Sequence, residues 1–428
     1  MIQKGRCNMQ ESEMRAYVEQ LCCEAAGVKY AVQALTTEEK NRALMRAAAL
    51  LKERSDEILK ANEQDIAAAL QSGMREVMVD RLKLTAERID QIALGLEQVA
   101  ELPDPLGEVL DSFERPNGMK IRKVRVPIGV IGIIYESRPN VTADAIALCF
   151  KSGNVSVLKG GSDAIESNRA ITKVLKAALA ECGIPEQAVQ LIDIPSRQAA
   201  AEFMQMREYV DIMIPRGSAG LIRTVVENSR IPVIETGAGN CMIYVDKDAD
   251  LQKAIPIILN AKTQRVSVCN AAESLVVHEQ ILDAFLPLLS EAVKNRVELR
   301  ADEKSIAYLP DAVPAAEEDF GREYLDYILS VKTVSSVQEA IDHINRYHTG
   351  HSDCIITENR EAAEAFLKQI DSACVYVNVS TRFTDGFEFG FGAEIGISTQ
   401  KLHARGPMGL AELTSYKYLI EGEGQVRG

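Results

Sequence analysis

The stretch VPIGVIGIIYESRPNVTADAIALCFKSGNVSVLKGGSDA, residues 126–164, decides the fold class of this chain. Residues 129–135 form an almost continuous apolar run, which predicts a strand buried on both faces. A helix is predicted over 141–151, and a second buried strand over 155–159. Strand, helix and strand in this order predict a parallel sheet covered by helices on both faces, and so an α/β fold.

The alternation continues towards the C-terminus. Strands are predicted over 189–194, 211–214 and 231–235, and a second α/β segment over about 251–379. That segment has strand candidates at 274–277, 331–334, 354–357 and 374–378, separated by helices over 281–293, 337–347 and 360–369. Before residue 105 the chain is predicted to be helical, with a capping box formed by Thr36 and Glu39 and a helix that begins near Thr85.

Two segments stand outside this alternation. Residues 107–125 alternate apolar and charged side chains around Pro116, Asn117 and Gly118, which predicts a β-hairpin. The tail, 389–428, is glycine-rich and ends in a strand candidate over 415–420. The pattern therefore divides the chain into 1–105 with 126–253, then 254–388, and the two outlying segments 106–125 and 389–428.

Composition excludes several classes of protein. The 428 residues carry a net charge of −14, with 46% hydrophobic and 26% charged residues. Nucleic acids and anionic membranes attract clustered Lys and Arg, so neither is expected as a partner. No apolar run is long enough to span a bilayer, and the first ten residues lack a signal-peptide core. The nine cysteines follow no disulfide or zinc pattern, so we expect a cytoplasmic, reduced protein. The five histidines show no H-E-x-x-H spacing, so we expect no metal site.

Ligands of parallel sheets bind at the carboxyl ends of the strands. Asn140 follows the first core strand and is either a helix N-cap or a neutral donor to an oxyanion. Lys159 ends the next strand, in a Lys-Gly-Gly-Ser sequence that ends at Ser162 and can equally be an ordinary turn. Glu235 is predicted to end a strand and is a candidate general base.

Two glycine-containing turns have open interpretations. Arg216, Gly217 and Ser218 open a helix, so this turn either holds a phosphate with backbone N–H groups or is a plain tight turn. The dinucleotide fingerprint G-x-G-x-x-G is absent from the expected turn, and Gly237 to Gly239 is only a G-x-G fragment, which is a weak signal.

Cys269 lies in QRVSVCNAAE, residues 264–273. This sequence predicts an extended chain turning into a helix, whose positive end would favour the thiolate. The alternative is an unreactive cysteine that packs as a small hydrophobic side chain.

Five motifs in one order resemble a known family. They are YESRPNVTADA (135–145), VLKGGSDA (157–164), IPRGSAGLI (214–222), QRVSVCNAAE (264–273) and EIGISTQKLHARGPMGL (394–410). They are similar to those of the γ-glutamyl phosphate reductases, also called glutamate-5-semialdehyde dehydrogenases, a branch of the aldehyde dehydrogenase superfamily. The resemblance covers nearly the whole chain. It implies a Rossmann-type NADP-binding domain over 1–105 and 126–253 and an α/β catalytic domain over 254–388. It also implies a small β flap for oligomerisation, with oligomerisation elements and the C-terminal tail in 106–125 and 389–428.

The resemblance also implies a reaction. It is the NADPH-dependent reduction of L-glutamyl 5-phosphate to L-glutamate 5-semialdehyde and phosphate, in L-proline biosynthesis. Cys269 matches the family's catalytic cysteine, which carries a thioester, and Asn140 its oxyanion donor. Lys159 matches the lysine that holds the adenosine ribose. Ser162 stands where NAD-preferring relatives commonly have Glu, which favours NADP, and the turn Arg216, Gly217, Ser218 matches the pyrophosphate side.

The resemblance leaves other roles open. Glu235 stands where the superfamily has the base that activates water, a step that a reductase does not need, so its role is structural or that of a proton shuttle. Six polar residues are candidates for binding the substrate, with surface or capping roles as the alternative; they are Arg138, His351, Ser352, Ser380, Thr381 and Arg382. A homodimer or a dimer of dimers is expected. The competing functions are a hydrolytic NAD(P)-dependent aldehyde dehydrogenase and a catalytically retired scaffold, for example for γ-glutamyl kinase.

Overall fold

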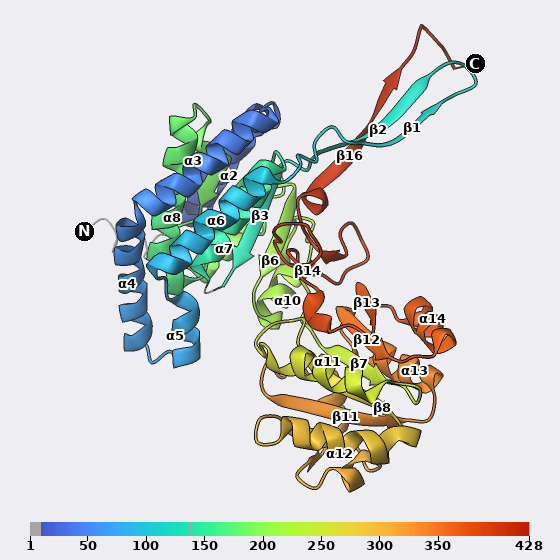
Figure 1. Cartoon of the computed structure of the whole chain (residues 1–428). Coiled ribbons are helices and arrows are strands. Elements are labelled where there is room, and N and C mark those ends of the chain that lie inside the picture. Colours follow the sequence, from blue (N-terminus) through green and yellow to red (C-terminus); the bar gives the residue numbers. More distant parts are fainter. Residues whose placement is uncertain (1–9, 137, 428) are drawn as a thin grey trace. The chain divides into compact units, whose positions relative to one another are not determined.

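The computed structural model describes residues 10–136 and 138–427 in two compact units (Figure 1). Unit 1 comprises Met1–Glu235, Gly390–Gly396 and Met408–Gly428, and unit 2 comprises Thr236–Phe389 and Ile397–Pro407. The expected boundary at 253/254 differs from this division. The strand β7 (Cys241–Val245) pairs with strands on either side of it in the unit 2 sheet, which brings residues before 254 into that unit.

Unit 1 contains a four-stranded parallel sheet in the order β5-β4-β3-β6. Its strands are β3 (Val130–Tyr135), β4 (Val155–Lys159), β5 (Val189–Leu191) and β6 (Ile212–Arg216). Every residue of β3 and β4 is buried, which confirms the interpretation of their apolar runs.

The predicted strand over 231–235 is wrong. Only an isolated bridge joins Val233 to Met213, with the Met213 N–H donating to the Pro232 carbonyl at 2.8 Å. Pro232 has no N–H to extend a ladder, so the chain runs beside β6 without forming a strand.

Helices cover the sheet of unit 1. They are α2 (Glu11–Gln33), α3 (Thr37–Glu53), α4 (Ser55–Gln71), α5 (Glu76–Leu82), α6 (Ala86–Glu101), α7 (Pro139–Lys151), α8 (Ile165–Glu181), α9 (Arg197–Phe203) and α10 (Ala219–Asn228), with 3₁₀ turns η1 (Ser162–Ala164), η2 (Glu186–Ala188) and η7 (Ala411–Leu413). The predicted capping box is present, because the Glu39 N–H donates to Thr36 Oγ1 at 3.2 Å and the Thr36 N–H to Glu39 Oε2 at 2.8 Å. Thr85 caps α6 as expected.

A three-stranded antiparallel sheet, which we call the ribbon, completes unit 1. It consists of β1 (Val109–Glu114), β2 (Lys120–Pro127) and β16 (Thr414–Glu421), in the order β1-β2-β16 (Figure 1). The predicted hairpin is confirmed, with the Gly118 N–H donating to the Arg115 carbonyl at 2.8 Å and Gly118 at a φ of 85°. The predicted C-terminal strand adds to its other side.

Unit 2 contains a seven-stranded parallel sheet in the order β10-β9-β11-β8-β7-β12-β13. Besides β7, its strands are β8 (Ala272–His278), β9 (Glu298–Ala301), β10 (Val313–Pro314), β11 (Ile328–Val334), β12 (Ser352–Ile356) and β13 (Cys374–Val377). A short pair, β14 (Ile397–Ser398) and β15 (Gly406–Pro407), lies apart from that sheet.

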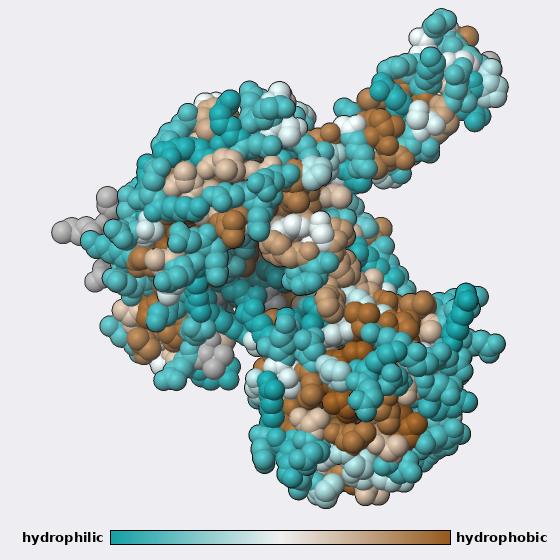
Figure 2. Space-filling model, in the orientation of Figure 1, coloured by the Kyte–Doolittle hydropathy of each residue, from teal (hydrophilic) through white to brown (hydrophobic). Residues whose placement is uncertain are grey.

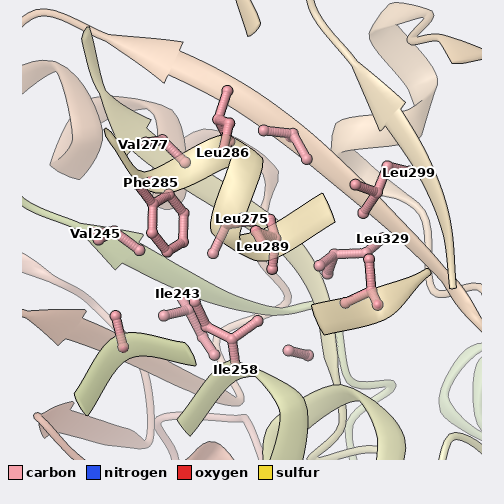
Figure 3. Close-up of a cluster of buried hydrophobic side chains, with 14 of the residues drawn as sticks. Ile243, Val245, Ile258, Leu275, Val277, Phe285, Leu286, Leu289, Leu299 and Leu329 are labelled. Carbon is pink, nitrogen blue, oxygen red and sulfur yellow. The ribbon is translucent and has the colours of Figure 1, made fainter. Parts of the chain in front are cut away.

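Helices cover both faces of the unit 2 sheet, as predicted. They are α11 (Leu251–Thr263), α12 (Leu282–Val293), α13 (Val337–Tyr347) and α14 (Arg360–Gln369), with 3₁₀ turns η3 (Glu279–Ile281), η4 (Ser305–Tyr308), η5 (Glu317–Gly321) and η6 (Thr381–Phe383). Ile258, Leu275 and Phe285 join α11, β8 and α12 in one core (Figure 3). A second core joins Tyr244 and Phe366 beneath α13 and α14.

Candidate active site

The carboxyl ends of β3, β4 and β6 share one edge of the unit 1 sheet. Tyr135 lies opposite Arg216, and Ile134 lies opposite Lys159. The structure therefore brings together, within unit 1, the sequence-predicted residues that follow these strands. They are Arg138, Asn140, Lys159, Ser162, Arg216, Gly217 and Ser218.

Asn140 is the second residue of α7, and Arg138 occupies the N-cap position with an extended backbone. The N-cap interpretation of Asn140 is therefore wrong. Its exposed carboxamide donates to Asp144 Oδ2 at 3.1 Å. Burial raises the pKa of Asp144 to about 6, while the Asn140 hydrogen bond and the charge of Arg216 act in the opposite direction.

Lys159 is the last residue of β4 and is 5% exposed. Its Nζ donates to the Gly160 carbonyl at 2.8 Å. Burial lowers the pKa of Lys159 to about 8, against the smaller effect of the Asp163 carboxylate. The Ser162 side chain is exposed where η1 begins, so the segment ends in an accessible hydroxyl.

Glu136, which the sequence reasoning missed, directly follows β3, and its carboxylate contacts the turn after β6. The Ser218 N–H and Oγ donate to its two carboxylate oxygens at 2.8 and 2.9 Å. A Cβ on Gly217 would lie 2.7 Å from Glu136 Oε2, so glycine permits this approach. Ser218 is also the N-cap of α10. The donors at this helix end thus bind an anionic group in the structure.

Cys269 lies in a turn between α11 and β8, and it is partly exposed. The predicted helix after Cys269 is wrong, because Ala272–His278 is a fully buried strand. The backbone of Gly239 lies against this turn so closely that a Cβ would be 1.5 Å from the Cys269 carbonyl oxygen. The Cys241 thiol donates to the same oxygen at 3.1 Å. The turn is therefore positioned by backbone packing.

The 3₁₀ turn η6 packs on the residue after Cys269. Thr381 Oγ1 donates to the Asn270 carbonyl at 2.8 Å, and Asn270 Nδ2 donates to the Thr384 carbonyl at 2.9 Å. Ser380 caps η6. The structure thus brings three predicted substrate residues, Ser380, Thr381 and Arg382, to the Cys269 turn.

Arg382 interacts electrostatically with that turn. Its Nε donates to Gln264 Oε1 at 2.9 Å. Burial lowers the pKa of the Arg382 guanidinium, and the charge of Arg265 adds to this effect. The charge of Asp385 opposes it, as does the negative form of Cys269. The Arg382 cation therefore lies within electrostatic range of Cys269.

His351 and Ser352 are fully buried beneath η6. His351 Nδ1 lies 2.8 Å from Ser352 Oγ, and Ser352 Oγ lies 2.6 Å from Thr384 Oγ1. Thr384 Oγ1 is in turn 2.7 Å from the Tyr376 hydroxyl. This hydrogen-bonded chain supports the segment that carries the three residues named above.

Glu235 is half-buried and directly precedes unit 2. It ends no strand, contrary to the expectation, because the chain around it forms only isolated bridges.

A buried ion pair under the Cys269 turn was also missed by the sequence reasoning. Lys262 Nζ lies 2.6 Å from Glu273 Oε2, with side chains 1% and 0% exposed. Glu273 also accepts the Leu325 N–H at 3.1 Å. Burial raises the pKa of Glu273 and lowers that of Lys262, and the pairing opposes both shifts. The pair joins α11 to β8, the two elements between which Cys269 lies.

Two classes of feature do not occur in residues 10–136 and 138–427. No group of three or more His, Cys, Asp or Glu side chains is placed to hold a metal ion. No described helix has both the length and the apolar character needed to cross a membrane.

Comparisons with known proteins agree on a family. The model of the aldehyde dehydrogenase family matches residues 6–306 and 310–418. The γ-glutamyl phosphate reductase of Carboxydothermus hydrogenoformans is 56% identical over 395 residues, which are 92% of this chain and 95% of that protein. The γ-glutamyl phosphate reductase of Thermotoga maritima has a solved structure that is 51% identical, with a TM-score of 0.94 over 96% of this chain and all of that chain (100%). An engineered glycolyl-CoA reductase with bound NADP⁺ shares the fold at 16% identity, with a TM-score of 0.67 over 94% of this chain and 96% of that chain.

Proposed function

The chain belongs to the γ-glutamyl phosphate reductases of the aldehyde dehydrogenase family, and from this premise we propose that it reduces L-glutamyl 5-phosphate to L-glutamate 5-semialdehyde and phosphate. It is an oxidoreductase of a family that uses a nicotinamide cofactor, and we propose NADPH for this chain. The reaction would serve L-proline biosynthesis in the cytoplasm.

The single observation that carries the mechanism is the setting of Cys269. Its turn is partly exposed and lies within range of the Arg382 cation, which favours a nucleophilic thiolate. In the proposed first step, the Cys269 sulfur attacks the acyl carbon, and the bond from that carbon to the phosphate oxygen breaks. Phosphate leaves with the bonding electrons, and a thioester remains on Cys269.

Asn140 is proposed to stabilise the oxygen of this acyl group. Its exposed carboxamide is a neutral N–H donor, which suits the negative charge that develops on that oxygen. After reduction, the resulting thiohemiacetal alkoxide forms the aldehyde C=O bond as the carbon–sulfur bond breaks, and Cys269 is released as a thiolate.

The residues at the edge of the unit 1 sheet fit NADPH. In the structure, Ser218 at the N-terminal end of α10 binds the Glu136 carboxylate. Gly217 and Ser218 therefore suit the pyrophosphate, with Arg216 beside them. Lys159 would hold the adenosine ribose. The Ser162 hydroxyl can donate to a 2′-phosphate, which a carboxylate in its place would repel. When bound, NADPH supplies the hydride that reduces the thioester.

The substrate's charged groups need polar partners. Arg382, Thr381 and Ser380 adjoin the Cys269 turn and are proposed to bind its phosphate or α-carboxylate, with Arg138 as a further candidate. His351 and Ser352 are proposed to act on the substrate site through Thr384. An acyl phosphate is labile, so association with the γ-glutamyl kinase that supplies it is part of the proposal.

The second candidate, a hydrolytic NAD(P)-dependent aldehyde dehydrogenase, depends on the half-buried Glu235. A base that activates water would destroy the acyl intermediate of a reductase, so we assign Glu235 a structural or proton-transfer role. The third, a retired scaffold, is disfavoured because Cys269, Asn140 and Lys159 are all present.

The test uses Cys269→Ala with NADPH and enzymatically generated glutamyl phosphate. We expect turnover to fall by at least about 10³-fold, because the covalent step is lost. The matched control is Cys23→Ala, which removes an exposed thiol of α2 and should leave turnover unchanged. Retained activity in Cys269→Ala would contradict the mechanism.

The reverse reaction separates the candidates. Oxidation of the semialdehyde should require phosphate and yield the acyl phosphate. Oxidation to glutamate without phosphate would instead support the hydrolytic enzyme. A chain that neither binds NADPH nor reacts with iodoacetamide at Cys269 would support the scaffold.

A further inference from the structure

A second candidate binding site lies in unit 1, away from the strand ends described above. It is a groove of about 520 Å³ between α2, α8 and the edge strand β5. Helix α8 lines it with one stripe of side chains, at Arg169, Thr172, Lys173 and Lys176, which are spaced by three and four residues. Ten residues separate Thr172 from Ser162, which corresponds to about 15 Å at the rise of an α-helix. The groove is therefore separate from the proposed cofactor residues.

One wall of the groove is fixed by internal contacts. The Tyr17 hydroxyl donates to Asp193 Oδ1 at 2.6 Å, and Arg169 Nε lies 3.4 Å from Asp193 Oδ2. Arg169 also pairs with Glu166 at 2.5 Å. The carboxylate of Asp193 is therefore neutralised within the wall and does not set the charge of the open space.

The other cationic side chains that line the groove form only weak ion pairs with carboxylates. Lys173 lies 3.4 Å from Glu57, in a pair whose side chains are 71% and 54% exposed, and Arg54 lies 4.0 Å from Glu181. Pairs with this exposure and length are weak. With Lys176, these residues give the groove three cations. Glu186 also lines the groove, and Glu24 adjoins it by accepting from Gln190 Nε2 at 3.0 Å.

Lys176 is the central cation of the groove. Its Nζ donates to the neutral Gln190 Oε1 at 2.9 Å, and burial lowers its pKa against the charges of Glu186 and Glu24. A partly desolvated ammonium group on a neutral acceptor gains most from an anion placed beside it.

Thr172 gives an independent indication of a ligand. It is 5% exposed and lines the groove, and its Oγ1 has no hydrogen-bond partner among the described residues. Buried hydroxyls are nearly always hydrogen-bonded. The oxygen itself is buried, so the side chain would have to rotate about χ1 before the hydroxyl could meet a polar group in the groove.

We propose that this groove binds a small organic anion with a carboxylate or phosphate group and a short apolar part. The anionic group would lie at Lys176, Lys173 and Arg54, with a polar atom bonded to Thr172. The apolar part would lie against Leu21, Ala177 and Leu191. Such a ligand would join α2 to α8 without touching the residues assigned to the reaction.

The test is calorimetric titration of the full chain, saturated with NADPH, with citrate as the carboxylate probe and inorganic pyrophosphate as the phosphate probe. We expect at least one probe to bind with a Kd below about 1 mM, and Lys176→Gln to weaken it about tenfold or more. The matched control, Lys60→Gln, changes an exposed lysine of α4 outside the groove and should change the Kd less than about twofold. Turnover without probe should be the same in both variants.

Two further variants distinguish a loss of binding from a folding defect in Lys176→Gln. Lys173→Gln changes an exposed side chain and should also weaken binding, and Thr172→Val removes the hydroxyl while keeping the shape. If only citrate binds, the ligand is assigned to the carboxylates. If only pyrophosphate binds, the ligand is assigned to the phosphates. The proposal is overturned if neither probe binds, or if Lys60→Gln weakens binding as much as Lys176→Gln.

Discussion

Gly239 controls the position of the candidate nucleophile at the scale of a single residue. Its backbone leaves no room for a side chain, since the nearest atom to a Cβ would be a backbone oxygen that cannot rotate away. We expect Gly239→Ala to displace the Cys269 turn, to destabilise the fold by about 1–3 kcal/mol and to reduce turnover more than cofactor affinity. Thermal unfolding and steady-state kinetics measure both effects.

A matched glycine serves as the control. Gly27 lies in α2, and a Cβ there would meet nothing within 4 Å. Gly27→Ala should stabilise the chain by about 0.5–1 kcal/mol through helix propensity and leave turnover unchanged. Normal activity of Gly239→Ala would show that the turn tolerates displacement.

Lys159 links cofactor affinity to pH. With its pKa lowered by burial to about 8, its ammonium group is largely present at pH 7 and is lost as the pH rises through 8 and above. NADPH titrations should therefore give a Kd that increases between about pH 7.5 and 9.5. Lys159→Met should bind more weakly and lose that pH dependence. A wild-type Kd that is flat over this interval would argue against cofactor contact by Lys159.

At the scale of single residues, the sequence predicted the site residues that lie at the ends of strands. It did not predict the residues that pack against the site from distant parts of the chain. Lys159 and Arg216 follow apolar runs, so their place at the sheet edge was predictable. Gly239 was considered only as part of a nucleotide-loop fragment. Its true neighbour, Cys269, lies thirty positions further along the chain, and no local pattern indicates a contact at that distance.

The ion pair between α11 and β8 makes a prediction at the scale of elements. Removing the cation leaves the Glu273 carboxylate buried and uncompensated, so Lys262→Met should lower the free energy of unfolding by about 3–5 kcal/mol. Urea denaturation followed by circular dichroism measures the change. Lys253→Met provides the control on the same helix, because its pair with Glu358 is about half exposed, at 50% and 51%, and its loss should change the stability little.

A double variant tests the cause. Lys262→Met combined with Glu273→Leu removes both charges and should recover much of the stability lost in the single variant. If the double variant is as unstable as Lys262→Met, loss of packing rather than a lone charge is responsible.

Local propensity explains the element-scale errors. Ala271, Ala272 and Glu273 are good helix formers, so the sequence after Cys269 was interpreted as a helix start. Tertiary pairing overrides this preference, since Glu273 meets Lys262 across elements and β8 is buried between β7 and β11. Apolar runs of five or more residues, such as β3, were predicted correctly because burial on both faces determines them.

The ribbon matters at the scale of the whole molecule. All six residues of β1 are exposed, and β16 presents Tyr416, Tyr418 and Ile420 at exposures of 50%, 53% and 61%. Figure 2 shows hydrophobic surface on the ribbon among hydrophilic side chains. These three side chains alternate with others and so share one face of the strand. A small sheet with exposed edges and an apolar face is marginally stable unless another surface covers it.

We therefore expect the ribbon to join protomers in a homodimer or a dimer of dimers. Tyr418→Asp combined with Ile420→Asp should shift the mass in light scattering to that of the monomer. Lys417→Glu changes a side chain of the opposite face and should leave the mass unchanged. A monomeric wild-type chain would refute the expectation.

The division of the chain was predicted in outline. Two α/β units and a β excursion follow from composition and alternation, but the predicted boundary fell after β7. Which of two parallel sheets a buried strand joins depends on its neighbours in space, and an apolar run such as Cys241–Val245 carries no signal for either sheet.

The pair Lys262–Glu273 also has a consequence for how descendants of this chain can diverge. If one of the two residues is replaced before the other, the intermediate protein has a buried charge without a partner and is less stable. Selection against unstable proteins would remove such an intermediate. The two codons are therefore expected to change together or to persist together. An inherited constraint of this kind would persist whichever substrate the enzyme's descendants acquired.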